Sequence, residues 1–337
     1  MTQCVVTVFG GSGFLGRHLV KRLAAAGAMV RVAVRNPEDA HYLKTMGEAG
    51  QIVPVATNIC DKASTAAAAE RADWVINLVG ILSEWGKRTF RRIHVEGAAN
   101  IAEAASMAGA QRLVHVSAIG ADPQSPSAYG RTKAQGEEAV KAAFTAATIV
   151  RPSIVFGPED NFFNFFAGLA RFSYLLPVVG CPFPPRFTLF SGGSLVDIDL
   201  YGGGGTKFQP VYAGDVAEAV MAILADPKTR GETFELGGPR VYSFKEIMEL
   251  MLAETGRQRL LLPVPFRLLR LQAWFLEKWP KPLLTRDEVK LLEKDNVVGK
   301  KVLTFSDLGI EPTTAEAIAP TYLGRFRPPG KQHLGKV

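Results

Sequence analysis

Short apolar runs alternate with amphipathic segments over the first half of the chain. The apolar runs are typical of strands buried on both faces, and the segments between them have the periodicity of helices. The predicted strands are residues 4–11, 29–35, 51–58, 73–80, 112–120 and 147–157. The predicted helices are residues 14–27, 62–72, 97–109 and 128–143. This alternation predicts an α/β fold, a Rossmann-type doubly wound parallel sheet with right-handed crossovers.

The pattern changes after Gly157. Residues 161–187 are rich in phenylalanine and proline, and four consecutive glycines at 202–205 predict a flexible, exposed loop. A predicted helix over 213–226 and a predicted strand over 231–238 resume the alternation of the first half of the chain. Ser243 and Glu246 have the spacing of a capping box at the start of a further helix.

These changes predict a nucleotide-binding part and a smaller mixed lobe. Residues 264–298 are expected to be helical and amphipathic, and the chain from Pro320 onward is expected to form an extended basic arm. The predicted domains are 1–157 with 206–238 returning to the sheet, a lobe of 158–205 and 239–319, and a tail of 320–337.

Composition narrows the class of protein. A hydrophobic content of 47% excludes a disordered chain. The net charge of +7 arises within residues 257–337, which hold 15 Lys and Arg against 8 Asp and Glu. Such a region fits an acidic protein partner or anionic lipid, and we expect no nucleic-acid partner.

Cysteine and histidine are scattered. Three widely spaced cysteines predict free thiols in a reducing compartment, and five dispersed histidines predict no metal site. No apolar run is long enough to cross a bilayer, and the first strand begins so early that we expect no signal or transit peptide.

A glycine-rich loop follows the first predicted strand. Gly10, Gly13 and Gly16 have the spacing that permits a tight turn, close approach to a pyrophosphate, and close packing of the next helix. Its place between a strand and a helix in a βαβ unit predicts a dinucleotide site.

The residue after the second strand indicates which dinucleotide binds. Arg35 stands where NAD sites usually have an acidic residue, and a guanidinium can pair with a 2′-phosphate. This favours NADP(H) over NAD(H), with Arg17 as a second candidate. We expect Asn58 and Ile59 to flank the adenine, and Val79 and Gly80 to line the ribose.

Tyr129 and Lys133 lie one helical turn apart after the fifth strand. A nearby ammonium lowers the pKa of a phenol, which would let Tyr129 exchange a proton with a carbinol oxygen. The lysine could instead bind the hydroxyls of the nicotinamide ribose, which requires no catalysis.

Residues 1 to about 255 resemble the extended and atypical short-chain dehydrogenase/reductase families. The resemblance rests on "GGSGFLG", "LVHVSAIG", "YGRTK", "RPSIVFGPED" and "QPVYAGDVAEAV". Two features depart from the family pattern. His94 stands where an asparagine is usual, and Ala118 and Ile119 occupy the usual positions of the catalytic hydroxyl. Ser117 could substitute for that hydroxyl.

The sequence of the smaller lobe and the basic C-terminal region show a narrower resemblance, to the nucleotide-binding accessory subunits of respiratory complex I. The resemblance implies a tightly bound, structural NADPH, other subunits of the hydrophilic arm near the quinone-site junction as partners, and a peripheral place on the cytoplasmic face of a bacterial inner membrane. The expected cofactor-binding residues are Gly10, Ser12, Gly13, Phe14, Leu15, Gly16, Arg17, Arg35, Asn58, Ile59, Val79, Gly80, Ser117, Tyr129, Lys133, Pro152 and Ile154.

The aromatic lobe has two interpretations. Its phenylalanines could form a packed core, or an apolar surface for a protein or membrane partner. Trp274 and Trp279 among basic residues suit contact with lipid headgroups.

Three functions therefore remain open. The favoured one is a non-catalytic NADPH-binding subunit of complex I. The second is an active reductase or epimerase that uses Tyr129 and Lys133, and the third is a redox-sensing regulator.

Overall fold

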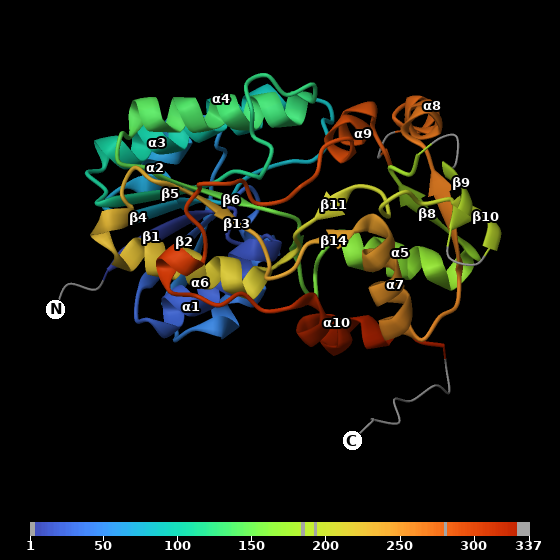
Figure 1. Ribbon diagram of the computed structural model, residues 1–337. Helices are drawn as coiled ribbons and strands as arrows, with labels where there is room; N and C mark the ends of the chain where they lie inside the picture. Colours follow the sequence, from blue (N-terminus) through green and yellow to red (C-terminus); the bar gives the residue numbers. More distant parts are fainter. Residues whose placement is uncertain (1–3, 183–185, 192–193, 280–281, 329–337) are drawn as a thin grey trace. The chain divides into compact units, whose positions relative to one another are not determined.

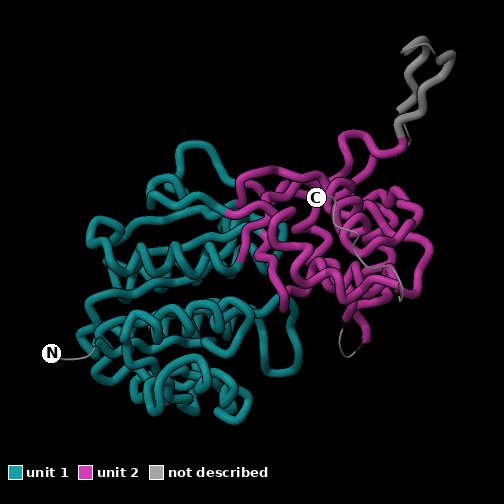
Figure 2. The backbone as a smooth tube through the Cα atoms, turned by 90° about the horizontal axis from the view of Figure 1, so that it is seen from below, with its two compact units in different colours: residues 1–153, 213–237, 298–312 teal, residues 154–212, 238–297, 313–337 magenta. Residues whose placement is uncertain are grey.

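The computed structural model describes residues 4–182, 186–191, 194–279 and 282–328. The chain forms two compact units, shown in teal and magenta in Figure 2. Unit 1 contains residues 1–153, 213–237 and 298–312, and unit 2 contains 154–212, 238–297 and 313–337. Residues 298–312, predicted to lie in the smaller lobe, therefore belong to the sheet unit.

Unit 1 is built on a seven-stranded sheet with the order β13-β6-β5-β4-β1-β2-β3, and every neighbouring pair is parallel. The strands are β1 (Val5–Phe9), β2 (Met29–Val34), β3 (Ile52–Ala56), β4 (Trp74–Asn77), β5 (Arg112–Val116), β6 (Thr148–Pro152) and β13 (Thr233–Leu236). The predicted doubly wound parallel sheet is confirmed. The strand order reverses at β1, and ligands of such sheets bind at the crevice beyond this reversal.

Helices cover both faces of this sheet, as Figure 1 shows, with α2, α3 and α4 on one face and α1 and α6 on the other. They are α1 (Phe14–Ala25), α2 (Lys62–Ala69), α3 (Gly97–Met107), α4 (Ala128–Ala143) and α6 (Ala213–Ala225). The other helical segments are the 3-10 helices η1 (Pro37–Met46), η3 (Pro227–Thr229) and η4 (Ser306–Leu308) and the π-helical turn η2 (Arg91–Glu96). The core beneath α2, α3 and α4 consists mostly of alanine, which allows helix and sheet to approach closely.

The turn η2 is a single π-helical segment that leads directly into α3. Helix α4 packs against it so tightly that a Cβ atom at Gly136 would lie 2.1 Å from the carbonyl oxygen of His94. Such π turns are frequent at functional sites. This contact fixes the segment that carries His94 against the helix that carries Tyr129 and Lys133.

Unit 2 combines helices with two-stranded sheets, of which two are parallel and two are antiparallel. The helices are α5 (Phe162–Phe172), α7 (Phe244–Thr255), α8 (Phe266–Leu276), α9 (Arg286–Leu292), α10 (Ala315–Leu323) and the turn η5 (Gly324–Phe326). The strands are β7 (Val155–Phe156), β8 (Leu175–Val179), β9 (Arg186–Ser191), β10 (Ser194–Asp199), β11 (Lys207–Phe208), β12 (Val211–Tyr212), β14 (Tyr242–Ser243) and β15 (Leu260–Val264).

Many phenylalanines of the aromatic segment are part of the unit 2 core. The ring of Phe162 lies within 6 Å of the rings of Phe163, Phe166, Phe208 and Phe244. The core interpretation is therefore correct for these residues. Phe165 and Phe172 of the same helix are 46% and 83% exposed.

Three of the four glycines at 202–205 are packed, and the prediction of a flexible, exposed loop was wrong for Gly202, Gly204 and Gly205. Gly203 is exposed, and a Cβ atom there would have no neighbour within 4 Å. All four have φ between +57° and +85°. A Cβ atom at Gly205 would lie 2.1 Å from the carbonyl oxygen of Val179, so β8 passes directly against this backbone. Glycine is required here for both conformation and space.

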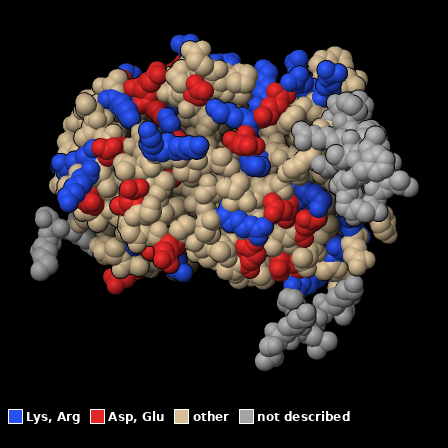
Figure 3. All heavy atoms as spheres, viewed as in Figure 1, with Lys and Arg blue, Asp and Glu red and all other residues tan. Residues whose placement is uncertain are grey.

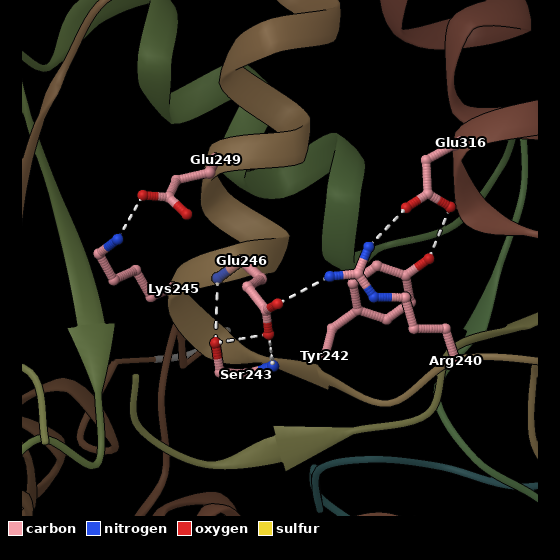
Figure 4. A network of polar contacts seen from close by, with 7 residues as sticks. All are labelled: Arg240, Tyr242, Ser243, Lys245, Glu246, Glu249 and Glu316. Atoms are coloured by element: carbon pink, nitrogen blue, oxygen red, sulfur yellow. Dashed lines mark hydrogen bonds and ion pairs between the residues drawn. The ribbon is translucent and has the colours of Figure 1, made fainter. Parts of the chain in front are cut away.

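The predicted capping box of α7 is confirmed, and Figure 4 shows it within a larger network. The Glu246 carboxylate accepts from the Ser243 backbone N–H (2.7 Å) and pairs with Arg240 (2.8 Å). Glu316 at the start of α10 pairs with Arg240 (3.4 Å) and accepts from the Tyr242 hydroxyl (2.6 Å). The network thus joins the starts of α7 and α10.

The C-terminal region differs from the extended arm that was predicted from Pro320 onward. Pro320 lies inside α10, and the Tyr322 hydroxyl donates to buried Asp160 over 2.7 Å. Residues 329–337 of the predicted tail lie outside the described residues. Residues 264–298 form α8 and α9 rather than one continuous helix.

Gly136→Ala tests the contact between α4 and η2. The added methyl group meets backbone atoms that can move little, so we expect the thermal unfolding midpoint to fall by roughly 3–10 °C. Gly324→Ala is the control, because a Cβ there has no neighbour within 4 Å. An unchanged midpoint for Gly136→Ala would show that the contact is not as tight as described.

Candidate functional site

The glycine loop joins β1 to α1 at the reversal of strand order. Gly10 has φ +80°, which a tight turn needs, and a Cβ at Gly16 would lie 2.4 Å from the carbonyl oxygen of Gly11. Helix α1 begins at Phe14 after the N-cap residue Gly13, without a side-chain cap or an acidic residue in its first turn. Backbone N–H groups at such a helix start are suited to bind a pyrophosphate.

Sequence reasoning missed two residues that hold this loop. A Cβ at Gly11 would lie 2.9 Å from a methyl carbon of Val32, so this glycine is also needed for close packing. The Tyr42 hydroxyl donates to the carbonyl of Ser12 over 2.8 Å, and the Arg17 guanidinium lies 5.2 Å from the Tyr42 ring centre. The spacing of the glycines carried no signal for Tyr42, which is 30 residues away.

The end of β4 continues the site beside the glycine loop. A Cβ at Gly10 would lie 3.2 Å from Val79, and one at Gly80 would lie 3.5 Å from the Lys133 ammonium nitrogen. The Val79 N–H donates to the side chain of Asn77 (3.0 Å). The structure therefore brings Gly10, Val79, Gly80 and Lys133 together along the carboxyl edge of the sheet.

The remaining predicted residues take different positions. Arg35 is exposed just beyond β2, and Asn58 is exposed after β3, whereas Ile59 and Pro152 are buried. The Ile59 side chain packs beneath α3, close to Gly97. Ile154 belongs to unit 2. Phe14 and Leu15 form the first turn of α1.

Tyr129 differs electrostatically from the prediction. Burial raises its pKa to about 12, so the phenol is protonated at neutral pH, and the expected lowering by Lys133 was wrong. Lys133 is buried and donates to the Val116 carbonyl over 3.1 Å. Burial lowers the pKa of Lys133 to about 8, with Glu137 opposing that shift.

His94 occupies the place of the usual asparagine and is 2% exposed. Its Nε2 accepts from the Ile81 N–H (3.1 Å), and its Nδ1 lies 3.2 Å from the Thr132 hydroxyl. Its ring packs edge-on against Tyr129, with centres 5.3 Å apart. Burial, assisted by the Lys133 charge, lowers the His94 pKa to about 3, so the ring is a neutral structural group.

A second buried histidine, which sequence reasoning did not assign, lies on the same face of the sheet. The Asn77 amide group lies 3.0 Å from Nδ1 of His115, and burial lowers the His115 pKa to about 3. Within the part of the chain that the structure describes, His115 Nε2 and Ser117 Oγ are buried without a hydrogen-bond partner. Buried polar atoms without partners indicate a site for a ligand or water.

These residues fit a dinucleotide. The loop has backbone donors that suit phosphates, and the Lys133 and Ser117 side chains are polar groups that would suit the ribose and nicotinamide end. Among the described residues, no group of three or more His, Cys, Asp and Glu is placed to hold a metal ion.

A parallel sheet of this order with this glycine loop defines a dinucleotide-binding α/β protein. Residues 6–237 match the NAD dependent epimerase/dehydratase family. The chain is 35% identical over 338 residues to the mitochondrial NADH dehydrogenase (ubiquinone) 1 alpha subcomplex subunit 9 of Arabidopsis thaliana, covering 97% of this chain and 79% of the relative. It is 33% identical over 324 residues to the mitochondrial NADH-ubiquinone oxidoreductase 40 kDa subunit of Neurospora crassa, covering 95% and 79%.

The chain therefore belongs to the NAD dependent epimerase/dehydratase family, together with these subunits of mitochondrial NADH dehydrogenase. Among solved structures, an NADPH-dependent quinone oxidoreductase of Escherichia coli complexed with NADPH superimposes with a TM-score of 0.69 at 18% identity, covering 94% of this chain and 99% of the other. At that identity the likeness shows the fold alone.

The two buried histidines predict a loss of stability in mild acid. The unfolded histidines have a pKa of about 6.5, so below that pH the unfolded chain binds protons that the folded chain does not. We expect the free energy of unfolding to fall by about 2 kcal/mol for each histidine between pH 7 and pH 5.

Urea unfolding of His94→Gln at both pH values tests this expectation. The variant should lose about half of the pH-dependent change, while His41→Gln, at an exposed position, should retain it. A pH dependence of His94→Gln equal to that of the wild type would contradict the assignment of His94 as a neutral buried ring.

Proposed function

We propose that the chain is a non-catalytic, NADPH-binding accessory subunit of respiratory complex I that stabilises the hydrophilic arm near its junction with the membrane arm. The observation that carries this proposal is the similarity to NADH dehydrogenase subunits over 95–97% of the chain, through both units. We place it peripherally on the cytoplasmic face of a bacterial inner membrane. No helix among the described residues is long and apolar enough to cross a bilayer.

The state of the tyrosine supports a structural role for the cofactor. A phenol whose pKa is raised to about 12 donates its proton less readily than a free tyrosine, and it has almost no phenolate to accept one at neutral pH. The Lys133 ammonium donates to a backbone carbonyl, and the two positions after Ser117 carry no hydroxyl. A dinucleotide that binds only the folded chain would nevertheless stabilise it by linkage.

Unit 2 offers a surface for assembly, which we call the α8 surface: Leu268, Leu271, Trp274, Phe275 and Trp279. These side chains are 41–73% exposed, and the Lys278 ammonium lies 3.7 Å from the Trp274 ring centre. Apolar residues exposed together are typical of interaction sites. Figure 3 shows basic and acidic residues interspersed over the face that it views.

We propose that neighbouring subunits cover the α8 surface, with anionic lipid headgroups at the tryptophans. Basic side chains beside tryptophan suit the headgroup level of a membrane. Binding of the purified chain to phosphatidylcholine vesicles with and without phosphatidylglycerol tests the lipid contact separately from the protein contact. Equal, negligible binding to both would remove the lipid contact and leave the protein contact.

Fractionation of detergent-solubilised native membranes tests the assembly. We expect the chain to migrate with NADH:quinone oxidoreductase activity, and mass spectrometry of the denatured complex to detect NADPH. A Leu271→Ser, Phe275→Ser double variant should lower the fraction of the chain that migrates with the complex. Met107→Ser, at an 84% exposed position on α3, should leave that fraction unchanged. A chain found entirely as a small free protein would refute the proposal.

A second candidate function is NAD(P)H-dependent reduction or epimerisation. The buried Ser117 hydroxyl, which lacks a partner among the described residues, favours it, because such a donor could polarise a carbonyl. Turnover of a panel of carbonyl compounds with NADPH, lowered at least about 100-fold by Tyr129→Phe, would establish this function. We expect no turnover above background from the wild type or from the variant.

A further inference from the structure

A short, well-defined hairpin follows β4 beside the cofactor site. Trp85 and Arg88 exchange two backbone hydrogen bonds of 3.0 and 2.9 Å around Gly86, which has φ +55°. The Glu84 carboxylate accepts from the Phe90 N–H (2.6 Å), and the Arg92 guanidinium donates to the Lys87 carbonyl (3.0 Å). These bonds hold the hairpin at both ends, so it presents the exposed Arg88 in a defined place.

The sheet order brings together the end of β4, which leads into this hairpin, and the end of β2, which leads into Arg35. Strands β2 and β4 flank β1, and Phe9 is in register with both Ala33 and Asn77. Arg35 lies two residues beyond Ala33, so the ends of both strands border the glycine loop. Partial burial lowers the pKa of Arg88, and the charge of Arg35 lowers it further, so the two guanidiniums act on each other.

Two guanidiniums held together repel each other unless an anion lies between them. Neither Arg35 nor Arg88 pairs with a carboxylate among the described residues. Arg151 in the same unit shows the opposite arrangement, because Glu137 (2.6 Å) and Glu235 (3.5 Å) flank it and raise its pKa. The folded chain itself thus leaves the Arg35–Arg88 pair without a counter-ion.

We propose that Arg88 is a second residue, with Arg35, that binds the 2′-phosphate of NADPH and so determines cofactor choice. This inference rests on the proposed NADPH binding and adds the hairpin to the site. A phosphate dianion has three acceptor oxygens, and guanidiniums bind such groups through paired N–H donors. NADH has a hydroxyl at that position and gives Arg88 no anion to bind.

Titration of the purified full chain with NADPH and with NADH tests the inference. Removing a hydrogen bond to a charged group should weaken NADPH binding roughly 10–100-fold in Arg88→Ala, while the Kd for NADH should change less than about twofold. Arg88→Lys should recover part of the loss, since it restores the charge without the paired donors. Arg35→Ala shows, for comparison, how much NADPH affinity is lost when the other guanidinium is removed.

Arg91→Ala is the matched control, because this exposed arginine pairs with Glu96 and should leave both Kd values unchanged. The wild-type titration alone decides the proposed cofactor. A wild type that does not prefer NADPH would refute NADPH selectivity, and this inference with it. If the wild type prefers NADPH and Arg88→Ala retains the full preference while remaining folded by circular dichroism, Arg88 has no role at the 2′-phosphate and the proposed function stands.

Discussion

The contact of backbone against backbone at the start of α1 is the constraint on which the candidate site depends. Gly16 approaches the carbonyl of Gly11 so closely that no side chain fits between them. Helix α1 can therefore begin directly above the end of β1, with its first N–H groups available for an anion. Val79, Gly80 and Lys133 extend the site from this point along the edge of the sheet.

The polar groups behind this edge are largely engaged in holding the structure. His94 accepts from the backbone at Ile81, Lys133 donates to the backbone at Val116, and Asn77 contacts His115. The same residue types at the same positions could serve catalysis in an enzyme of this fold. Here burial keeps the histidines neutral and Tyr129 protonated.

Unit 2 uses its aromatic residues in two ways. Phe162 and its neighbours form the core. Phe165 and Phe172 of the same helix are exposed to solvent, and so are the residues of the α8 surface. An exposed apolar surface costs free energy in a lone protein, so an assembly that covers it would explain why it is retained. The similarity to subunits of a larger complex agrees with that explanation.

The sequence by itself determined the features that are local in the chain. Apolar periodicity predicted the single strands and helices, the glycine spacing predicted the tight loop, and Ser243 with Glu246 predicted the start of α7, because each depends on residues close together in the chain. The parallel sheet followed from the alternation of those strands and helices. Only the tertiary structure decided that Gly202, Gly204 and Gly205 are packed, that the Tyr129 pKa rises, and that the Arg35 charge acts on Arg88. Burial and charge at a residue depend on strands and helices that are distant in sequence, and no local pattern records which of them become neighbours.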